Sequence, residues 1–218
     1  MTYSQHFEEL GEHVYSVVLL KQDLQYFMTM PLEKQAQLFS KTPGLRRIIN
    51  LITRNLIIGV GICFNKRENY SFAEVGNSIL IGAPLDDAGK TVVRQVLVKA
   101  NEFAEDPVFK DHIKVLRDKH FAHIDLDRHK HQANVLYQEI IDAIVLIQEL
   151  YKALFEVLNQ SPLLYTSLET SAQQYVFQAI ESCHRVWNLV EAANEASQEY
   201  IPLWDVIGAL TGSASQKP

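Results

Sequence analysis

The residues of this sequence best suited to chemistry lie in residues 116–125, LRDKHFAHID, at the end of a predicted helix. Arg117 and His123 stand six positions apart in it. Histidine titrates near neutral pH and can take or return a proton. Arginine is always charged, and its paired N–H donors can hold the charge that develops on a phosphate. The two side chains together therefore suit a reaction at a phosphate.

One continuous α-helix would not bring these two side chains together. Six residues turn an α-helix through about 600°, which leaves Arg117 and His123 roughly 120° apart around the axis and roughly 9 Å apart along it. The side chains can converge if the helix ends between them, or if two copies of the chain meet across a two-fold axis.

The pattern Arg-x5-His with a polar residue directly after the arginine resembles the signature of the HEPN superfamily (higher eukaryotes and prokaryotes nucleotide-binding). The fuller string Arg-Asp-Lys-x-x-Ala-His, residues 117–123, is most similar to the branch related to bacterial abortive-infection proteins. The resemblance implies a dimeric endoribonuclease whose active cleft forms at the dimer interface. It covers the helices through Leu158, the N-terminal ones loosely, and does not extend past Pro162.

The resemblance also implies roles for the residues of the motif. The 2′-hydroxyl of RNA would attack the adjacent phosphate without a metal, with His123 moving protons and Arg117 stabilising the phosphate. Asp118 would orient a motif side chain, while Lys119 and His120 are weaker candidates for binding the substrate phosphate. The expected partners are RNA and a second copy of the chain, with a cognate antitoxin left open; neither a cofactor nor DNA is expected.

Two other functions compete for the same region. Five of the eight histidines lie in residues 112–131, and His123-x-Asp125-x-Asp127 offers ligands that suit a hard or borderline divalent ion. This is no recognised zinc spacing, and exposed His and Asp in a loop are commoner than a ligand set. The second alternative is a noncatalytic helical module that binds a partner protein or a nucleotide, since an Arg and a His at this spacing also occur by chance at helix ends.

Composition limits how the protein could bind nucleic acid. The chain has 218 residues, of which 47% are hydrophobic and 21% charged, as in a folded globular protein. Its formal net charge is -6, which counts against nonspecific coating of nucleic acid. Residues 105–131 hold six acidic and six basic side chains, so this region is balanced and not basic. A small local site for RNA is still allowed.

Apolar residues at helical spacing predict an all-α, multi-helix bundle that is HEPN-like and forms a two-fold dimer. A single domain is expected over 1–218, with 162–210 as a C-terminal helical extension and 211–218 as a frayed tail. Gly59 and Gly61 are expected to mark close approach of helices. The expected helices are 4–28, 32–39, 45–64, 71–82, 131–158, 167–193 and 202–210, with two more that begin at Asp86 or Asp87 and at Pro107.

The remaining features favour a cytoplasmic protein. Cys63 and Cys183 lie in apolar helical contexts and are expected to be reduced core thiols. No signal peptide opens the chain, and the most apolar run, residues 56–64, is too short to span a bilayer. Residues 45–64 are apolar on nearly every side and are expected to form the most buried helix.

Overall fold

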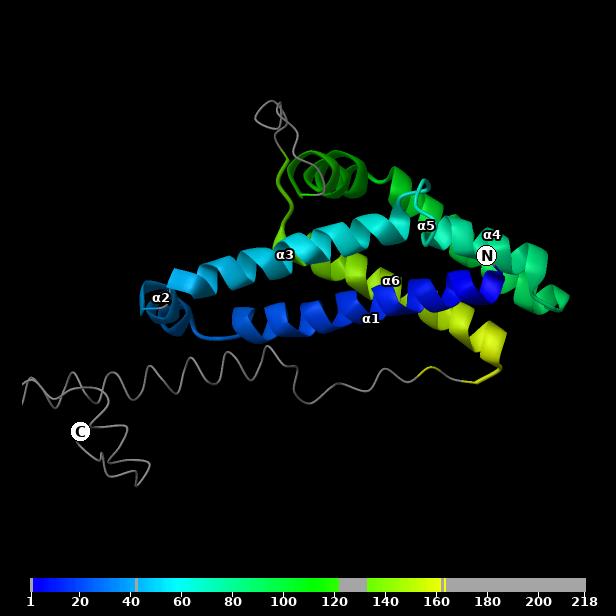
Figure 1. The fold of residues 1–218 in the computed structure, drawn as a ribbon, viewed down its shortest axis with the longest axis horizontal. Helices are drawn as coiled ribbons and strands as arrows, with labels where there is room; N and C mark the ends of the chain where they lie inside the picture. Colours follow the sequence, from blue (N-terminus) through cyan, green and yellow to red (C-terminus); the bar gives the residue numbers. More distant parts are fainter. Residues whose placement is uncertain (1, 42, 122–132, 162, 164–218) are drawn as a thin grey trace, which may run out of the picture. The chain divides into compact units, whose positions relative to one another are not determined.

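The computed structural model describes residues 2–41, 43–121, 133–161 and 163, and every element in these ranges is a helix (Figure 1). The predicted all-α class is therefore confirmed for this part of the chain. The expected helices at 167–193 and 202–210, the tail 211–218, Cys183 and His123 lie outside the described residues. The helices are α1 (Tyr3–Met28), α2 (Leu32–Lys41), α3 (Pro43–Phe64), α4 (Phe72–Gly82), α5 (Asp87–Glu105), η1 (Val108–Ile113), η2 (Leu116–Phe121) and α6 (Tyr137–Asn159).

The described residues belong to two compact units, each considered by itself. The first takes its described residues from Met1–Tyr26 and Arg47–Glu169, and the second from Phe27–Arg46. In the second unit the Phe27 and Phe39 rings pack edge to face with centroids 5.1 Å apart. All the candidate functional residues that the structure describes lie in the first unit.

Local capping interactions start two of the helices where the sequence predicts. The Ser71 hydroxyl accepts a hydrogen bond of 3.3 Å from the Glu74 N–H at the start of α4. The Asp86 carboxylate accepts one of 2.7 Å from the Gly89 N–H at the start of α5. Each bond satisfies a backbone donor that has no partner inside the first helical turn.

A cluster of phenylalanines joins α3, α4, α5 and η1 in the core of the first unit. The Phe64 ring lies 5.7 Å from Phe72, 4.5 Å from Phe103 and 6.0 Å from Phe109 between centroids. Such tilted and edge-to-face pairs add to the free energy gained by burying the rings. Cys63, the residue before Phe64, is buried and free, and burial raises the pKa of its thiol to about 12. The expected core thiol is thereby confirmed for Cys63.

Helix α1 packs against both α3 and α6 (Figure 1). A Cβ at Gly59 of α3 would overlap the Val17 side chain of α1, so the close approach predicted for this glycine is confirmed. Between α1 and α6, the Phe7 and Tyr151 rings stack with centroids 5.1 Å apart. Small residues at helix crossings thus set how closely these helices pack.

Helix α3 has the largest share of buried residues among the described helices, as expected, although part of its surface is exposed. Ile52, Leu56 and Val60 are covered by the core, whereas Leu51 is 54% exposed. Gly44–Phe64 is long and apolar enough to cross a membrane by length and composition, a test that core helices of soluble proteins also pass. The buried residues Ile52, Leu56 and Val60 are what a core helix would show.

The helix expected over 131–158 begins later than predicted. Residues 133–136 are not helical, and α6 starts at Tyr137. The Leu136 N–H donates a hydrogen bond of 2.7 Å to the Glu139 carboxylate, which gives that donor a partner at the helix start. The apolar spacing continues before Leu136, so the sequence predicted a start for this helix that is too early.

Candidate functional site

The helix that carries Arg117 is wound more widely than an α-helix. After Pro107 the chain forms two π-helical segments, η1 and η2, separated by only two residues. Hydrogen bonds in a π-helix span five residues instead of four, and such turns are rare and often found at functional sites. The angle of about 120° between Arg117 and His123 assumed α-helical winding, so it does not hold through Phe121.

The stem of Arg117 is buried against α3. Only 11% of the Arg117 side chain is exposed, and a Cβ added at Gly61 would overlap its Cδ and lie 3.2 Å from its Nε. Gly61 therefore provides the space that the arginine occupies, which confirms the close approach predicted for this glycine. The contact joins η2 directly to α3.

The guanidinium of Arg117 is paired with two carboxylates. Its Nη2 donates to the Glu68 carboxylate, and its Nη1 donates to the Asp118 carboxylate at 3.2 Å. Its Nε is buried and makes no hydrogen bond to any described residue. The Asp118 contact is of the kind expected from the polar residue that follows the arginine.

Glu68 is the functional candidate that the sequence analysis missed. It lies in the short connection between α3 and α4, 49 residues from Arg117 in the sequence. Glu68 is the single carboxylate in the polar run of residues 65–69, but nothing in that run marks it as the partner of a distant arginine. Only the packing of η2 against α3 brings the two together.

The two carboxylates decide what Arg117 can do in this conformation. With one guanidinium between Glu68 and Asp118, the cluster carries a net negative charge when both acids are ionised. A phosphate would be repelled by this cluster unless it took the place of one carboxylate as the acceptor. Glu68 is the partner that can be exchanged, because Asp118 is tied to Arg117 by adjacency in the chain.

The structure describes only some of the other predicted site residues. Lys119 lies half-buried in η2, and the backbone of His120 belongs to the same segment. His123, Asp125 and Asp127 are outside the described residues, so neither the catalytic histidine nor the alternative metal ligands are tested. Within the ranges that the structure does describe, no group of three or more His, Cys, Asp or Glu side chains could hold a metal ion.

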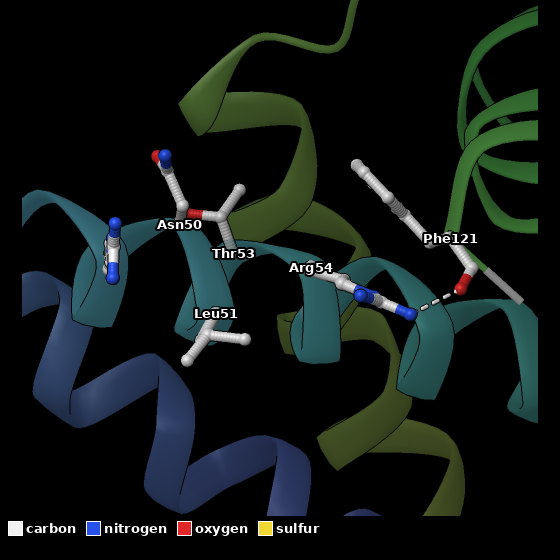
Figure 2. A pocket seen from close by; sticks show the side chains of 6 residues that line it. Asn50, Leu51, Thr53, Arg54 and Phe121 are labelled. Atoms are coloured by element: carbon white, nitrogen blue, oxygen red, sulfur yellow. Dashed lines mark hydrogen bonds between the residues drawn. The ribbon is translucent and has the colours of Figure 1, made fainter.

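A groove with two arginines lies at the end of the motif helix (Figure 2). We call it the arginine groove; its volume is about 570 Å³, and Arg47, Asn50, Leu51, Thr53, Arg54 and Phe121 line it. The Arg54 guanidinium donates to the Phe121 carbonyl and lies 5.9 Å from the centroid of the Phe121 ring. Figure 2 shows this hydrogen bond between α3 and the end of η2.

The helical spacing of α3 explains the arrangement of this groove. Arg47, Asn50 and Arg54 are three and four positions apart, so they share one face of the helix. All three are exposed. Their spacing can be read in the sequence, but residues 45–64 were interpreted as the most buried helix, so no exposed polar face was predicted there. That Phe121 completes the groove could not be read from the sequence.

Comparison of the chain with protein-family models, curated proteins and solved structures finds no match. The function has to be inferred from the residues just described. They form two neighbouring parts, the ion-paired Arg117 and the arginine groove, and both include residues of η2 and α3.

Proposed function

We propose that this chain is a metal-independent endoribonuclease of the HEPN type, related to toxin or abortive-infection proteins and active as a cytoplasmic homodimer. The observation that carries the proposal is the environment of Arg117. The arginine of the motif has a side chain only 11% exposed, is paired with the adjacent Asp118 and lies on a π-helical segment. Burying a charge in this way is costly, which favours a functional reason for keeping it there.

The proposed reaction breaks one phosphodiester bond, removes a proton from the attacking 2′-hydroxyl and gives a proton to the departing 5′-oxygen. A His123 imidazole removes the proton from a 2′-hydroxyl, whose oxygen forms a bond to the adjacent phosphorus. The bond from phosphorus to the 5′-oxygen breaks, and that oxygen takes a proton from an imidazolium. The products are a 2′,3′-cyclic phosphate and a 5′-hydroxyl.

Arg117 would stabilise the phosphorane in this reaction. Its guanidinium can offer two parallel N–H donors to the equatorial oxygens, where negative charge develops. For this to happen, the phosphate replaces the Glu68 carboxylate as acceptor while Asp118 keeps the guanidinium oriented. The substrate-free pairing with Glu68 is then a resting state of the site.

The net charge of -6 limits how the RNA can be held. An acidic protein cannot bind an RNA strand along its whole surface, so we propose contact at a few bases and phosphates. RNA and the second subunit are the proposed partners, and a cognate antitoxin would be expected to cover the site of a toxin.

The first test is cleavage of a mixed single-stranded RNA in excess EDTA. Wild type is expected to cleave and to leave cyclic phosphate ends, whereas His123→Ala should lower the rate by roughly a hundredfold to ten-thousandfold through loss of proton transfer. Arg117→Lys should also be impaired, because an ammonium cannot bind two phosphate oxygens with a planar pair of donors. His13→Ala and Arg94→Ala, which change residues outside the motif, serve as matched controls.

Two outcomes would contradict the proposal. Cleavage that EDTA removes would instead favour a metal site formed by the histidines and aspartates of residues 112–131. Absence of cleavage by folded wild type would favour a noncatalytic binding module.

The noncatalytic module is the second candidate function, and the pairing of Arg117 favours it. A guanidinium shared by Glu68 and Asp118 is also what a purely structural ion pair would look like. In that case His123→Ala should leave folding and partner binding unchanged, and Arg117 variants should lose stability without any change in catalysis.

A further inference from the structure

We infer that the arginine groove binds a nucleotide of single-stranded RNA beside the motif, with the phosphate on Arg47 and Arg54 and the base on Phe121. This inference rests on the proposed function, because it names where the ribonuclease would hold its substrate. Phe121 occupies one of the variable positions of the Arg-x5-His motif, and the other groove residues lie on α3, outside the motif.

The charge of the groove is the first observation that supports the inference. Arg47 and Arg54 are both exposed, and none of the described residues that line the groove carries a carboxylate. Lys66 and Lys110, by contrast, both pair with Glu105 at 2.9 and 3.2 Å. Two exposed arginines with no carboxylate among the described lining residues, on a protein of net charge -6, favour an anionic ligand in the groove.

The planar side chain in the groove points to a nucleotide and not to a simple anion. Phe121 lines the groove, and the hydrogen bond from Arg54 to its carbonyl ties the end of η2 to α3 (Figure 2). Proteins bind single-stranded RNA by combining basic grooves with aromatic rings on which bases stack. The Asn50 amide can both donate to and accept from the edge of a base. The Thr53 hydroxyl donates to the Ile49 carbonyl and can accept a hydrogen bond from the base.

The dimensions of the groove suit such a ligand. Its volume of about 570 Å³ lies within the roughly 300–1,000 Å³ of typical small-molecule pockets. Arg47 and Arg54 are seven residues apart on one helix, which separates their Cα atoms by roughly 10 Å along the axis. The two guanidinium groups can therefore contact phosphates on either side of one bound nucleotide.

The position of the groove in the chain connects it to the proposed chemistry. Phe121 precedes His123 by two residues, and two residues of extended chain span roughly 7 Å at most. An RNA strand whose base lies on Phe121 thus has a neighbouring phosphate within reach of the motif. Arg47 and Arg54 would hold the strand, and Arg117 would act on the phosphate that reacts.

The test is a fluorescence anisotropy titration of the full chain with a labelled single-stranded RNA that carries 2′-O-methyl groups throughout. This probe cannot be cleaved by 2′-hydroxyl attack, so the measurement reports binding alone. Arg47→Ala and Phe121→Leu are each expected to weaken binding roughly tenfold, through loss of a phosphate contact and of a stacked base. Arg47→Ala should also make the dependence of log K on log salt shallower by roughly 0.7.

Arg94→Ala is the matched control, since Arg94 is an exposed arginine on α5 that does not line the groove. It should bind the probe as wild type does. Because Arg47 is exposed and no described side chain forms an ion pair with it, its replacement should leave the thermal unfolding midpoint unchanged. This keeps the test valid even if Phe121→Leu disturbs the end of η2.

Equal affinity of wild type, Arg47→Ala and Phe121→Leu for the probe would overturn the inference. The inference would also be overturned if wild type did not bind the RNA probe but bound an acidic peptide through Arg47. The proposed function fails separately: if the groove variants lose binding but wild type cleaves no RNA, the groove stands and the ribonuclease does not. If His123→Ala abolishes cleavage but the groove variants bind the probe like wild type, the ribonuclease stands and the groove does not.

Discussion

The Arg117 guanidinium, shared between a neighbouring carboxylate and a distant one, holds the motif helix against the rest of the first unit. Its stem fills the space that Gly61 leaves open, and its head pairs with Glu68 and Asp118. A buried ion pair adds little net stability compared with apolar packing, but the loss of one partner leaves the other charge poorly compensated. Removing the Glu68 charge should therefore lower the stability of the folded protein.

Glu68→Gln is predicted to lower the free energy of unfolding by about 1–3 kcal/mol, because the Arg117 charge would keep only Asp118 as an ionised partner. Urea unfolding followed by circular dichroism measures this. If Glu68 also competes with the substrate phosphate, the same variant should bind uncleavable RNA more tightly than wild type does.

Glu105→Gln is the matched control for this prediction. Glu105 is an exposed carboxylate, and hydrogen bonds from Lys66 and Lys110 lower its pKa. Solvent screens such surface pairs, so this variant should unfold at nearly the wild-type urea concentration. Equal stability of Glu68→Gln and Glu105→Gln would show that the Glu68 contact does not hold Arg117 in solution.

At the scale of the elements, short-range signals place the starts of α4 and α5. The caps at Ser71 and Asp86 depend on residues only three positions apart. A side-chain oxygen at such a position satisfies a backbone N–H that would otherwise need water, and Ser71 is fully buried. The cap of α4 should therefore contribute measurably to stability.

Ser71→Ala is predicted to lower the free energy of unfolding by about 1 kcal/mol, because the Glu74 N–H would lose its acceptor. Ser78→Ala, in the interior of the same helix, is the control and should unfold like wild type or slightly later, because alanine has the higher helix propensity. A Ser71→Ala protein as stable as wild type would mean that water or another group replaces the cap.

At the scale of the whole molecule, the proposed cleft needs two copies of the chain. Several large apolar side chains of the first unit are exposed and available for such contact: Tyr15 at 58%, Ile81 at 88%, Val98 at 55%, Leu136 at 69% and Val145 at 40%. Single exposed apolar side chains are common on monomers, so the oligomeric state has to be measured.

Static light scattering at micromolar concentration is predicted to give twice the 24.9 kDa mass of one chain. The physical reason is that the proposed cleft is built from the Arg117 and His123 of two copies, which a two-fold axis would bring together. A mass of one chain under these conditions would contradict a cleft built at a dimer interface.

The sequence by itself determined the helical class, the start of α4 near Ser71, the start of α5 at Asp86 or Asp87, and the close approach at Gly59. These features depend on periodicity and on neighbours within one helical turn, or on the absence of a side chain. The motif residues Arg117 and Asp118 were likewise found from their order in the chain, and so was their proposed chemistry with His123. The single domain over 1–218 and its C-terminal extension stay predictions.

The tertiary structure alone decided which residues surround the motif. Arg117 meets Glu68 across 49 positions of sequence, and Arg54 meets Phe121 across 67. The π-helical winding of η1 and η2 was also unreadable, because Phe109 and Ile113 are buried four positions apart as they would be in an α-helix. Such distant pairs form only when helices pack, because packing fixes which side chains lie opposite each other. Local helix propensity does not predict which helices will pack together.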